Sequence, residues 1–501
     1  MMPSDTPTGP VPITQFESLF TAEEAFAAFE RAILAARSTV VAGFRVFDLS
    51  TPLTSPEARA VGTDWFDLIL YKLNQGVAFD MTLTDFDPTV ATDDHRGSWR
   101  SARQFASVHE MSDGAPLRFE IALHPARVGL LPRLLFSPKV RKARTDAGGD
   151  ALTPGLNARK ARDDLSLAPT THHQKLAVID DEVLYIGGLD LNARRYDTKR
   201  HDRPAEQTWH DIHALVRGPV VEAAARHLAT FKDVVAASCA PVRPMPGFLR
   251  TLSARRRVPL VHIAPATVVA EIEETHLRAI ARCKGAIYLE TQFLRHLPIA
   301  QAVVDRAKLC ETLTCLVVLP AAPEDVAFAG NRDHDAKLGA QKQMEAVDLL
   351  SEGMGARLAV ASPAQRRPAL PSEMSDRTVL HGAPIIYVHS KLSLFAGQEG
   401  VLSSANLNGR SLRWDTEAGL HLTQPAHLAQ LWTRALGHWF PGLTWPDPHD
   451  DPLAFIGWVR TALAQNQAAA PQDRAHFLLP FPRQWDADLA TPLPVVPDEI
   501  V

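Results

Sequence analysis

Two segments that lie far apart in the chain carry the same pair of reactive side chains. His173 and Lys175 stand in the first segment, and His389 and Lys391 stand in the second, with one residue between the members of each pair. In extended backbone, side chains two residues apart point to the same side. Each pair can therefore present an imidazole, which attacks or moves a proton, and an ammonium, which holds an anionic oxygen. The repetition predicts two half-sites that face one pocket.

These groups suit the cleavage of a phosphodiester, which requires a nucleophile at phosphorus, an acid for the leaving alkoxide and cations for the non-bridging oxygens. We expect His173 to be the nucleophile and to form a phosphohistidine. His389 is the expected general acid, which then acts as a base on water or an alcohol; the reverse assignment of the two histidines stays open. Lys175 and Lys391 are expected to hold the phosphate oxygens. Because they supply positive charge, no metal or other cofactor is expected.

Two carboxylates stand at similar positions downstream of the two pairs. Asp211 follows Trp209-His210, and Glu417 follows Asp415-Thr416. An imidazole works only in the right tautomer, which a carboxylate on its other nitrogen can fix. Asp211 and Glu417 are the predicted partners, and which one serves which histidine stays open. His210 could bind a metal, but a buried histidine satisfied within the sheet is the favoured interpretation.

The context of the two pairs resembles the phospholipase D superfamily, whose members carry a duplicated His-Lys-Asp motif. The first copy reads His173-x-Lys175-x4-Asp180 and is followed by Gly187-Gly188-Leu189-Asp190-Leu191. The second reads His389-x-Lys391 and is followed by Ser403-Ser404-Ala405-Asn406-Leu407-Asn408-Gly409-Arg410-Ser411. Tyr288-Leu289-Glu290-Thr291-Gln292-Phe293 also resembles the segment that opens the second half in that family. The resemblance covers roughly residues 30 to 420 and implies two similar halves packed as a pseudo-dimer, with the active site at their interface.

The same resemblance implies roles for further residues. Asp180 would support the first motif, and Ala396 stands where the second motif would have the same aspartate, which weakens that half-site. Asn406 is implied to hold a phosphate oxygen. Asp190 stands where several relatives have such an asparagine; because a carboxylate repels phosphate, we expect it to position a lysine or the backbone. Glu290 is expected either to support the pocket or to stabilise its strand.

Alternating helix and strand patterns surround both pairs, which predicts an α/β fold of two similar mixed-sheet halves, each in α-β-α layers. The predicted organisation is a flexible N-terminus over 1–20, a first half over 21–239, a linker over 240–257 and a second half over 258–501 that ends in a helical extension. The linker is expected because the segment holds three prolines and ends in Arg255-Arg256-Arg257.

Residues 125–169 break this pattern and are interpreted as an insertion near the active site. The apolar stretch Val128–Phe136 runs into a basic stretch that extends from Arg133 to Arg144. Two interpretations are equally favoured. The segment is a surface loop whose apolar part folds into the core, or it is an apolar wedge with a basic flank that touches a lipid interface.

The composition sets the remaining expectations. The 501 residues are 46% hydrophobic and 22% charged, which is typical of a protein with a sizeable core. The formal charge of -5 gives no general basic field for nucleic acid. Four scattered cysteines indicate a reducing compartment. Without a signal peptide or a long apolar run, we expect a cytoplasmic monomer that contacts membranes peripherally, with export lacking such a signal left open.

Three functions are therefore compared. The first is a phosphodiesterase of phospholipase D type that cleaves the head-group bond of a phospholipid at a membrane surface, with possible exchange of the alcohol. The second is a metal-independent nuclease of the same superfamily, for which the basic stretch from Arg133 to Arg144 would bind nucleic acid. The third is a lipid-binding pseudoenzyme whose second half-site was lost at Ala396.

Overall fold

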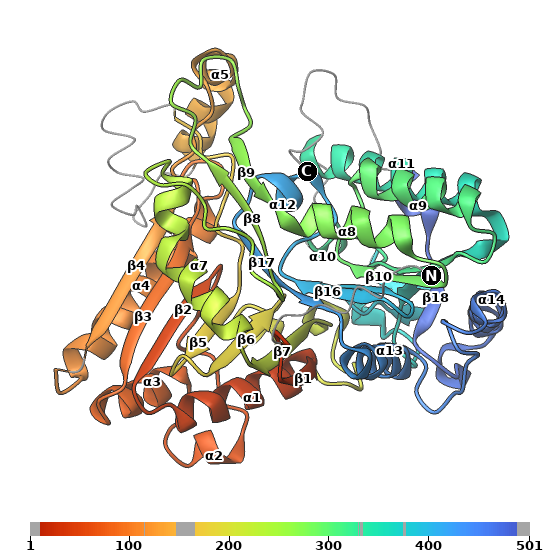
Figure 1. Cartoon of the computed structure of the whole chain (residues 1–501), viewed down its shortest axis with the longest axis horizontal. Helices are drawn as coiled ribbons and strands as arrows, with labels where there is room; N and C mark the ends of the chain where they lie inside the picture. Colours follow the sequence, from red (N-terminus) through yellow and green to blue (C-terminus); the bar gives the residue numbers. More distant parts are fainter. Residues whose placement is uncertain are drawn as a thin grey trace, which may run out of the picture.

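The computed structural model describes residues 11–114, 116–146, 166–328, 330, 334–373 and 377–487. Two large mixed sheets, each covered by helices, lie next to each other (Figure 1). This confirms the predicted α/β class and the two-half architecture.

The first sheet has seven strands in the order β1-β7-β6-β5-β2-β3-β4. Its strands are β1 Gln15–Phe20, β2 Thr39–Phe44, β3 Ala78–Asp85, β4 Leu117–Leu123, β5 Leu176–Ile179, β6 Val183–Gly187 and β7 Ile212–Arg217. Its helices are α1 Thr21–Ala35, α2 Pro56–Arg59, α3 Trp65–Asn74, α4 Thr92–Met111, α5 Leu130–Asp146 and α7 Val220–Val235.

The second sheet has nine strands in the order β18-β12-β11-β10-β15-β16-β17-β8-β9. Its strands are β8 Phe248–Ala254, β9 Ala266–Ala270, β10 Ala286–Thr291, β11 Thr314–Val318, β12 Leu358–Pro363, β15 Lys391–Phe395, β16 Glu399–Ser403, β17 Glu417–Leu422 and β18 Leu478–Pro480. A separate two-stranded sheet is formed by β13 Val379–Leu380 and β14 Ala383–Pro384. Its helices are α8 Glu271–Arg282, α9 Leu297–Leu309, α10 Glu324–Phe328, α11 His334–Met354, α12 Gly409–Arg413, α13 Pro425–Trp439, α14 Pro452–Ala468 and α15 Arg483–Ala487.

The two sheets repeat the same pairing around their motif strands. β2 pairs in parallel with β3 and antiparallel with β5, and β10 pairs in parallel with β11 and antiparallel with β15. β5 and β15 each continue into an antiparallel hairpin with β6 or β16. The structural repeat therefore places the residues just before β5 and those at the start of β15 at equivalent positions.

One buried cluster joins the two halves. It contains Val178 and Ile186 of the first sheet together with Leu392 and Leu402 of the second, all almost fully buried. Apolar burial of this kind is the main favourable term in folding. The halves consequently share one hydrophobic core.

Two boundaries differ from those predicted from the sequence. Residues 15–20 of the expected flexible N-terminus form β1, which pairs antiparallel with β7. Within the expected linker, Phe248–Ala254 forms β8, whose residues are all buried. The prolines and arginines on either side concealed this short strand, which pairs with β17 on one side and β9 on the other. The stretch 147–165 of the expected insertion and residues 1–10 lie outside the described residues.

No helix among the described residues is both long enough and apolar enough to cross a membrane.

Candidate active site

The two motif histidines are each held by a carboxylate from the opposite half. His173 Nδ1 lies 3.0 Å from Glu417 Oε1 and 3.1 Å from Oε2. His389 Nδ1 lies 2.6 Å from Asp211 Oδ2. The structure thus resolves which carboxylate contacts which histidine. Both contacts cross the interface between the two halves.

Main-chain contacts across the interface explain this crossing. The N–H of His173 donates to the carbonyl of Thr416 over 2.8 Å, and the N–H of Thr416 donates to the carbonyl of Thr171 over 3.0 Å. The N–H of His389 donates to the carbonyl of His210 over 2.8 Å in the same way. Each histidine segment is therefore paired in parallel with the segment that carries the other half's carboxylate.

Burial determines the protonation of these pairs. Desolvation raises the pKa of Asp211 to about 7 and that of Glu417 to about 8. Desolvation also lowers the pKa of both His173 and His389 well below the usual range, and nearby Lys175 and Lys391 lower them further. Burial therefore favours the neutral form of both members of each pair. Each pair then holds one proton up to about pH 7 for Asp211 and about pH 8 for Glu417.

Glu417 is held by two hydroxyl groups as well as by His173. The Ser404 hydroxyl donates to Glu417 Oε2 over 2.5 Å, and Ser411 supplies a second side-chain hydrogen bond. These bonds favour the ionised carboxylate and oppose the effect of burial on its pKa. They also fix the carboxylate orientation, which in turn fixes the imidazole.

The motif lysines lie beneath the histidines. Lys175 is fully buried, donates to the carbonyl of His173 over 2.6 Å and lies 3.7 Å from Asp190 Oδ2. Lys391 is also buried, and its Nζ lies 2.9 Å from His389 Nδ1. Burial lowers the pKa of Lys391 to about 7 and also lowers that of Lys175. Both ammonium groups therefore sit within the motif rather than extending into solvent.

A cavity of about 630 Å³ opens above the two histidines. His173, His389 and Asn406 line it, as do three arginines that sequence reasoning missed, Arg45, Arg195 and Arg410. Arg45 comes from the end of β2, Arg195 from the turn after β6, and Arg410 from α12. Arginine is well suited to phosphate oxygens because its donors are arranged in a planar fork. Of the three, only Arg410 lies inside a segment that the sequence singled out.

The remaining predicted site residues hold the site from outside the cavity or at its wall. Asp190 Oδ1 accepts from the N–H of Val46 over 2.9 Å, in addition to its proximity to Lys175. The Asn406 side-chain amide donates to Gln292 Oε1 over 3.2 Å. Glu290 is fully buried, accepts from Trp439 Nε1 over 2.7 Å and lies 2.8 Å from His210 Nε2. Glu290 thus lies in the core, below the cavity.

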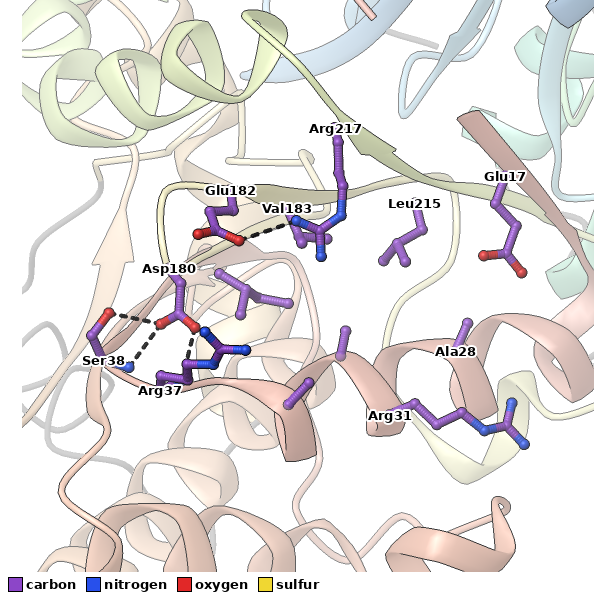
Figure 2. A pocket seen from close by; sticks show the side chains of 13 residues that line it. Glu17, Ala28, Arg31, Arg37, Ser38, Asp180, Glu182, Val183, Leu215 and Arg217 are labelled. Carbon is purple, nitrogen blue, oxygen red and sulfur yellow. Dashed lines mark hydrogen bonds and ion pairs between the residues drawn. The ribbon is translucent and has the colours of Figure 1, made fainter. Parts of the chain in front are cut away.

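Asp180 lies away from the motif histidines, where it caps the start of β2. Its carboxylate accepts from the backbone N–H groups of Arg37 and Ser38 and from the Ser38 hydroxyl (Figure 2). It also accepts from the N–H of Thr39. Neither motif histidine and neither motif lysine lines the pocket around Asp180. Asp180 therefore secures the β2–β5 register and takes no direct part in the chemistry.

A backbone carbonyl replaces this aspartate in the second half. Ala396 pairs with Ala286 as Asp180 pairs with Thr39, through an N–H to carbonyl bond of 2.9 Å in each case. The N–H of Thr39 donates to Asp180, whereas the N–H of Ala286 donates to the carbonyl of Pro448 over 3.1 Å. Gly285, just before Ala286, could not accept a side chain without crowding Ala396 and Pro448. The donor at the start of β10 is satisfied without a carboxylate.

Known proteins that are similar to this chain include phospholipases D. No family model matches the sequence. The chain is similar to phospholipase D alpha 1 of Oryza sativa subsp. japonica, with 24% identity over 387 residues that cover 53% of this chain and 47% of that protein. Phospholipase D alpha 2 of the same organism is 25% identical over 382 residues, which cover 52% of this chain and 46% of that protein. The chain spans about half the length of these curated relatives.

A solved structure shares the fold. The crystal structure of phosphatidylserine synthase from Haemophilus influenzae Rd KW20 superposes with a TM-score of 0.50 and 12% identity, covering 85% of each chain. The duplicated His-Lys motif and the similarity to the two phospholipases D show that the chain belongs to the phospholipase D superfamily.

Proposed function

We propose that this protein is a phosphodiesterase of phospholipase D type, which cleaves the head-group phosphodiester of a phospholipid. The observation that carries the proposal is the facing pair of histidines, each oriented by a carboxylate from the other half. The similarity to phospholipase D alpha over half of this chain supports the lipid substrate class.

The proposed reaction has two steps on the two histidines. His173 attacks phosphorus and forms a phosphoramidate bond as the bond to the head-group oxygen breaks, and His389 gives that oxygen its proton. His389 then takes a proton from water or an alcohol, whose oxygen attacks phosphorus and releases His173. Arg45, Arg195, Arg410 and Asn406 line the cavity where the non-bridging oxygens would lie. Lys175 and Lys391 add positive charge from below.

An exposed apolar ridge supports a substrate that lies in a membrane surface. The ridge consists of leucines 130, 131, 134 and 135 on α5 and of Val258, Leu260 and Val261 between β8 and β9, and each side chain is at least 44% exposed. Both segments rise side by side from the body of the protein (Figure 1). Apolar clusters of this kind are uncommon on freely soluble surfaces and mark sites of lipid or protein contact.

The backbone links the two parts of the ridge and joins them to the cavity. The N–H of Gly129 donates to the carbonyl of His262 over 2.8 Å, and a Cβ at Gly129 would lie 1.8 Å from the carbonyl oxygen of Pro259. The N–H of Val128 donates to the carbonyl of Leu167, and the next residue, Ala168, lines the cavity. A lipid held at the ridge would therefore have its phosphate close to the two histidines.

Basic residues flank the ridge. Arg141 and Lys142 are exposed on α5, and Arg255 and Arg257 are exposed where β8 leaves the sheet. Basic side chains beside an apolar face favour an interface with anionic lipid head groups. The combination of apolar and basic side chains favours a membrane over a free polynucleotide, which would be bound mainly through cations.

The substrate class is tested by presenting both candidates to the same enzyme. Vesicles of phosphatidylcholine and phosphatidylethanolamine with a fraction of phosphatidylglycerol are incubated with the protein, and plasmid DNA is incubated in parallel. We expect release of choline or ethanolamine and formation of phosphatidic acid, both absent with His173→Ala. Cleavage of DNA without any lipid product would overturn the proposal, and an inert protein would support the pseudoenzyme.

The ridge is tested by charge substitution at two of its most exposed positions. The double change Leu134→Asp and Leu135→Asp is expected to weaken binding to the same vesicles at least tenfold, because each leucine contributes about 1.5–3 kcal/mol when fully buried. Hydrolysis of vesicle lipid should fall in parallel, while hydrolysis of a short-chain lipid dissolved as monomers should not change. The matched control is Leu309→Asp on α9, where the leucine is 80% exposed outside the ridge. Equal vesicle binding by both variants would exclude the ridge as the contact surface.

A further inference from the structure

Three histidines gather in the core beside the active site but outside its cavity. They are His201, which follows the turn after β6, His210, which precedes β7, and His438 near the end of α13, and one ring nitrogen of each lies within 4.8 Å of the others. His201 Nε2 and His438 Nε2 lie 2.9 Å apart. None of the three lines the cavity that holds His173 and His389. The mechanism above makes no use of this cluster.

Carboxylates bind the outward nitrogens of two of these histidines. Asp197 Oδ2 lies 2.7 Å from His201 Nδ1, and Glu290 Oε1 lies 2.8 Å from His210 Nε2. Each carboxylate favours the tautomer with its proton on that nitrogen, which leaves the lone pair of the opposite ring nitrogen available. His210 Nδ1 is fully buried and has no hydrogen-bond partner. A carboxylate on the outer nitrogen and an available lone pair on the inner one is the arrangement found around histidines that bind metal ions.

We propose that His201, His210 and His438 form a binding site for one divalent zinc ion. Three neutral imidazoles are ligands that Zn²⁺ binds readily, at about 2.0–2.1 Å in a tetrahedral arrangement whose fourth position a water can fill. Tetrahedral ligands at that distance lie about 3.3 Å apart, so the ion would draw the His210 ring toward the other two. Because Asp197 holds the proton of His201 on Nδ1, the proton in the 2.9 Å contact belongs to His438 Nε2, and it moves to Nδ1 of the same ring when Nε2 binds the ion.

The surroundings match such a site. Phe20, Trp439 and Phe477 pack against the three rings and limit the access of water. His438 is only half-buried, which gives the ion a route in from the surface of α13.

A zinc ion here would fasten the two halves together next to the catalytic pair. His201 and His210 belong to the first half, whereas His438 belongs to the second. The carbonyl of His210 accepts from the N–H of His389, and Asp211 is the next residue. The ion would therefore stabilise the segment that positions Asp211 against His389 without contacting the substrate.

Zinc binding by the full chain tests the proposal without any activity measurement. The purified protein is stripped with a chelator and titrated with zinc chloride in a calorimeter, with bound zinc counted by mass spectrometry after desalting. We expect one zinc ion per chain and a rise in Tm of at least about 2 °C, since saturating a native-state site stabilises the fold. His438→Gln should weaken binding at least tenfold and remove the Tm shift.

The control variant is His427→Gln, which changes a half-buried histidine of the same helix that packs against Phe16 outside the cluster. It should bind zinc as the unaltered protein does, and circular dichroism verifies that both variants are folded. If the unaltered chain binds no stoichiometric zinc, or His438→Gln binds it equally well, the three rings form a hydrogen-bonded cluster only and the proposal is overturned. Neither result bears on phosphodiester cleavage, so the two proposals fail separately.

Discussion

His173→Ala is expected to lower turnover by at least about 10⁴-fold, because it removes the group that forms the covalent bond to phosphorus, whereas removing only an acid or base costs about 10² to 10⁴. The two histidines can be told apart with a phosphatidyl ester of p-nitrophenol, a leaving group that departs without a proton. His389→Ala should release one equivalent of nitrophenolate per active site in a fast phase and then turn over slowly, since its defect lies in activating water. His173→Ala should show no fast phase.

The covalent species gives a second readout. A lipid labelled in its diacylglycerol part should leave label on His389→Ala after denaturation at alkaline pH, at which a phosphohistidine survives. Label on His173→Ala alone would make His389 the nucleophile. Fast release by both variants would show that the histidines do not share one reaction. Asp180 gives no reason to prefer either histidine as the nucleophile, since it caps β2 and the carbonyl of Pro448 takes its place in the second half.

Replacing Glu417 or Asp211 is expected to lower turnover nearly as much as replacing His173. Each replacement should also change a different limb of the pH profile of activity. Glu417→Gln and Asp211→Asn each remove the acceptor that fixes an imidazole, which we expect to lower turnover by about 10² to 10⁴. His173 attacks only when Glu417 is ionised, so activity should rise with pH toward about 8, the pKa of Glu417. His389 donates only while its pair retains a proton, so activity should fall above about 7, the pKa of Asp211.

Because the rising and falling limbs overlap, the pH profile of activity is a narrow bell with its maximum between about pH 7 and about pH 8. Glu417→Gln should abolish the acidic limb and keep the alkaline one, and Asp211→Asn should do the opposite. The measurement is kcat/KM for the short-chain lipid from pH 5.5 to 9.5. If Glu417→Gln altered the alkaline limb instead, the carboxylates would serve the histidines of their own halves and the crossed pairing would be wrong.

The same pair predicts how stability depends on pH. Above about pH 6.5 an unfolded chain has lost the histidine proton, whereas the folded His173–Glu417 pair retains one proton up to about pH 8. The folded state then binds more protons, so the free energy of unfolding should fall as pH rises through this window. Glu417→Gln leaves a histidine whose pKa burial lowers, so this decrease should be absent from its denaturant titrations.

The sequence was sufficient for the type of fold, and the two motif histidines that it singled out line one cavity. The His-Lys pairs stand at equivalent ends of two interior strands, β5 and β15, because the hydrophobic pattern repeats with them. The pairing of Asp211 with His389 could not be predicted. Each carboxylate follows the histidine of its own half in the sequence, so sequence order gives no sign of the crossed pairing. That pairing depends on the parallel bridges between residues 172 and 416 and between 210 and 388.

The arginines of the cavity and the apolar ridge depend on contacts between distant segments, and such contacts produce no recognisable sequence pattern. Arg45 follows β2 and Arg195 lies after β6, and the fold of the first half brings these two distant positions to one cavity. The apolar ridge combines α5 with the turn between β8 and β9, which are distant in sequence and joined by main-chain hydrogen bonds. A pattern that identifies an apolar segment does not say whether another segment covers it.

The carbonyl of Pro448 at the start of β10 bears on how relatives of this protein are recognised. A main-chain oxygen is present whatever side chain the residue carries, so substitution cannot delete it and a search by residue type cannot detect it. Screens that demand the third motif aspartate in both copies would classify a chain like this one as half inactive. The safer criterion is whether the first N–H of the central strand has an acceptor, whichever atom provides it.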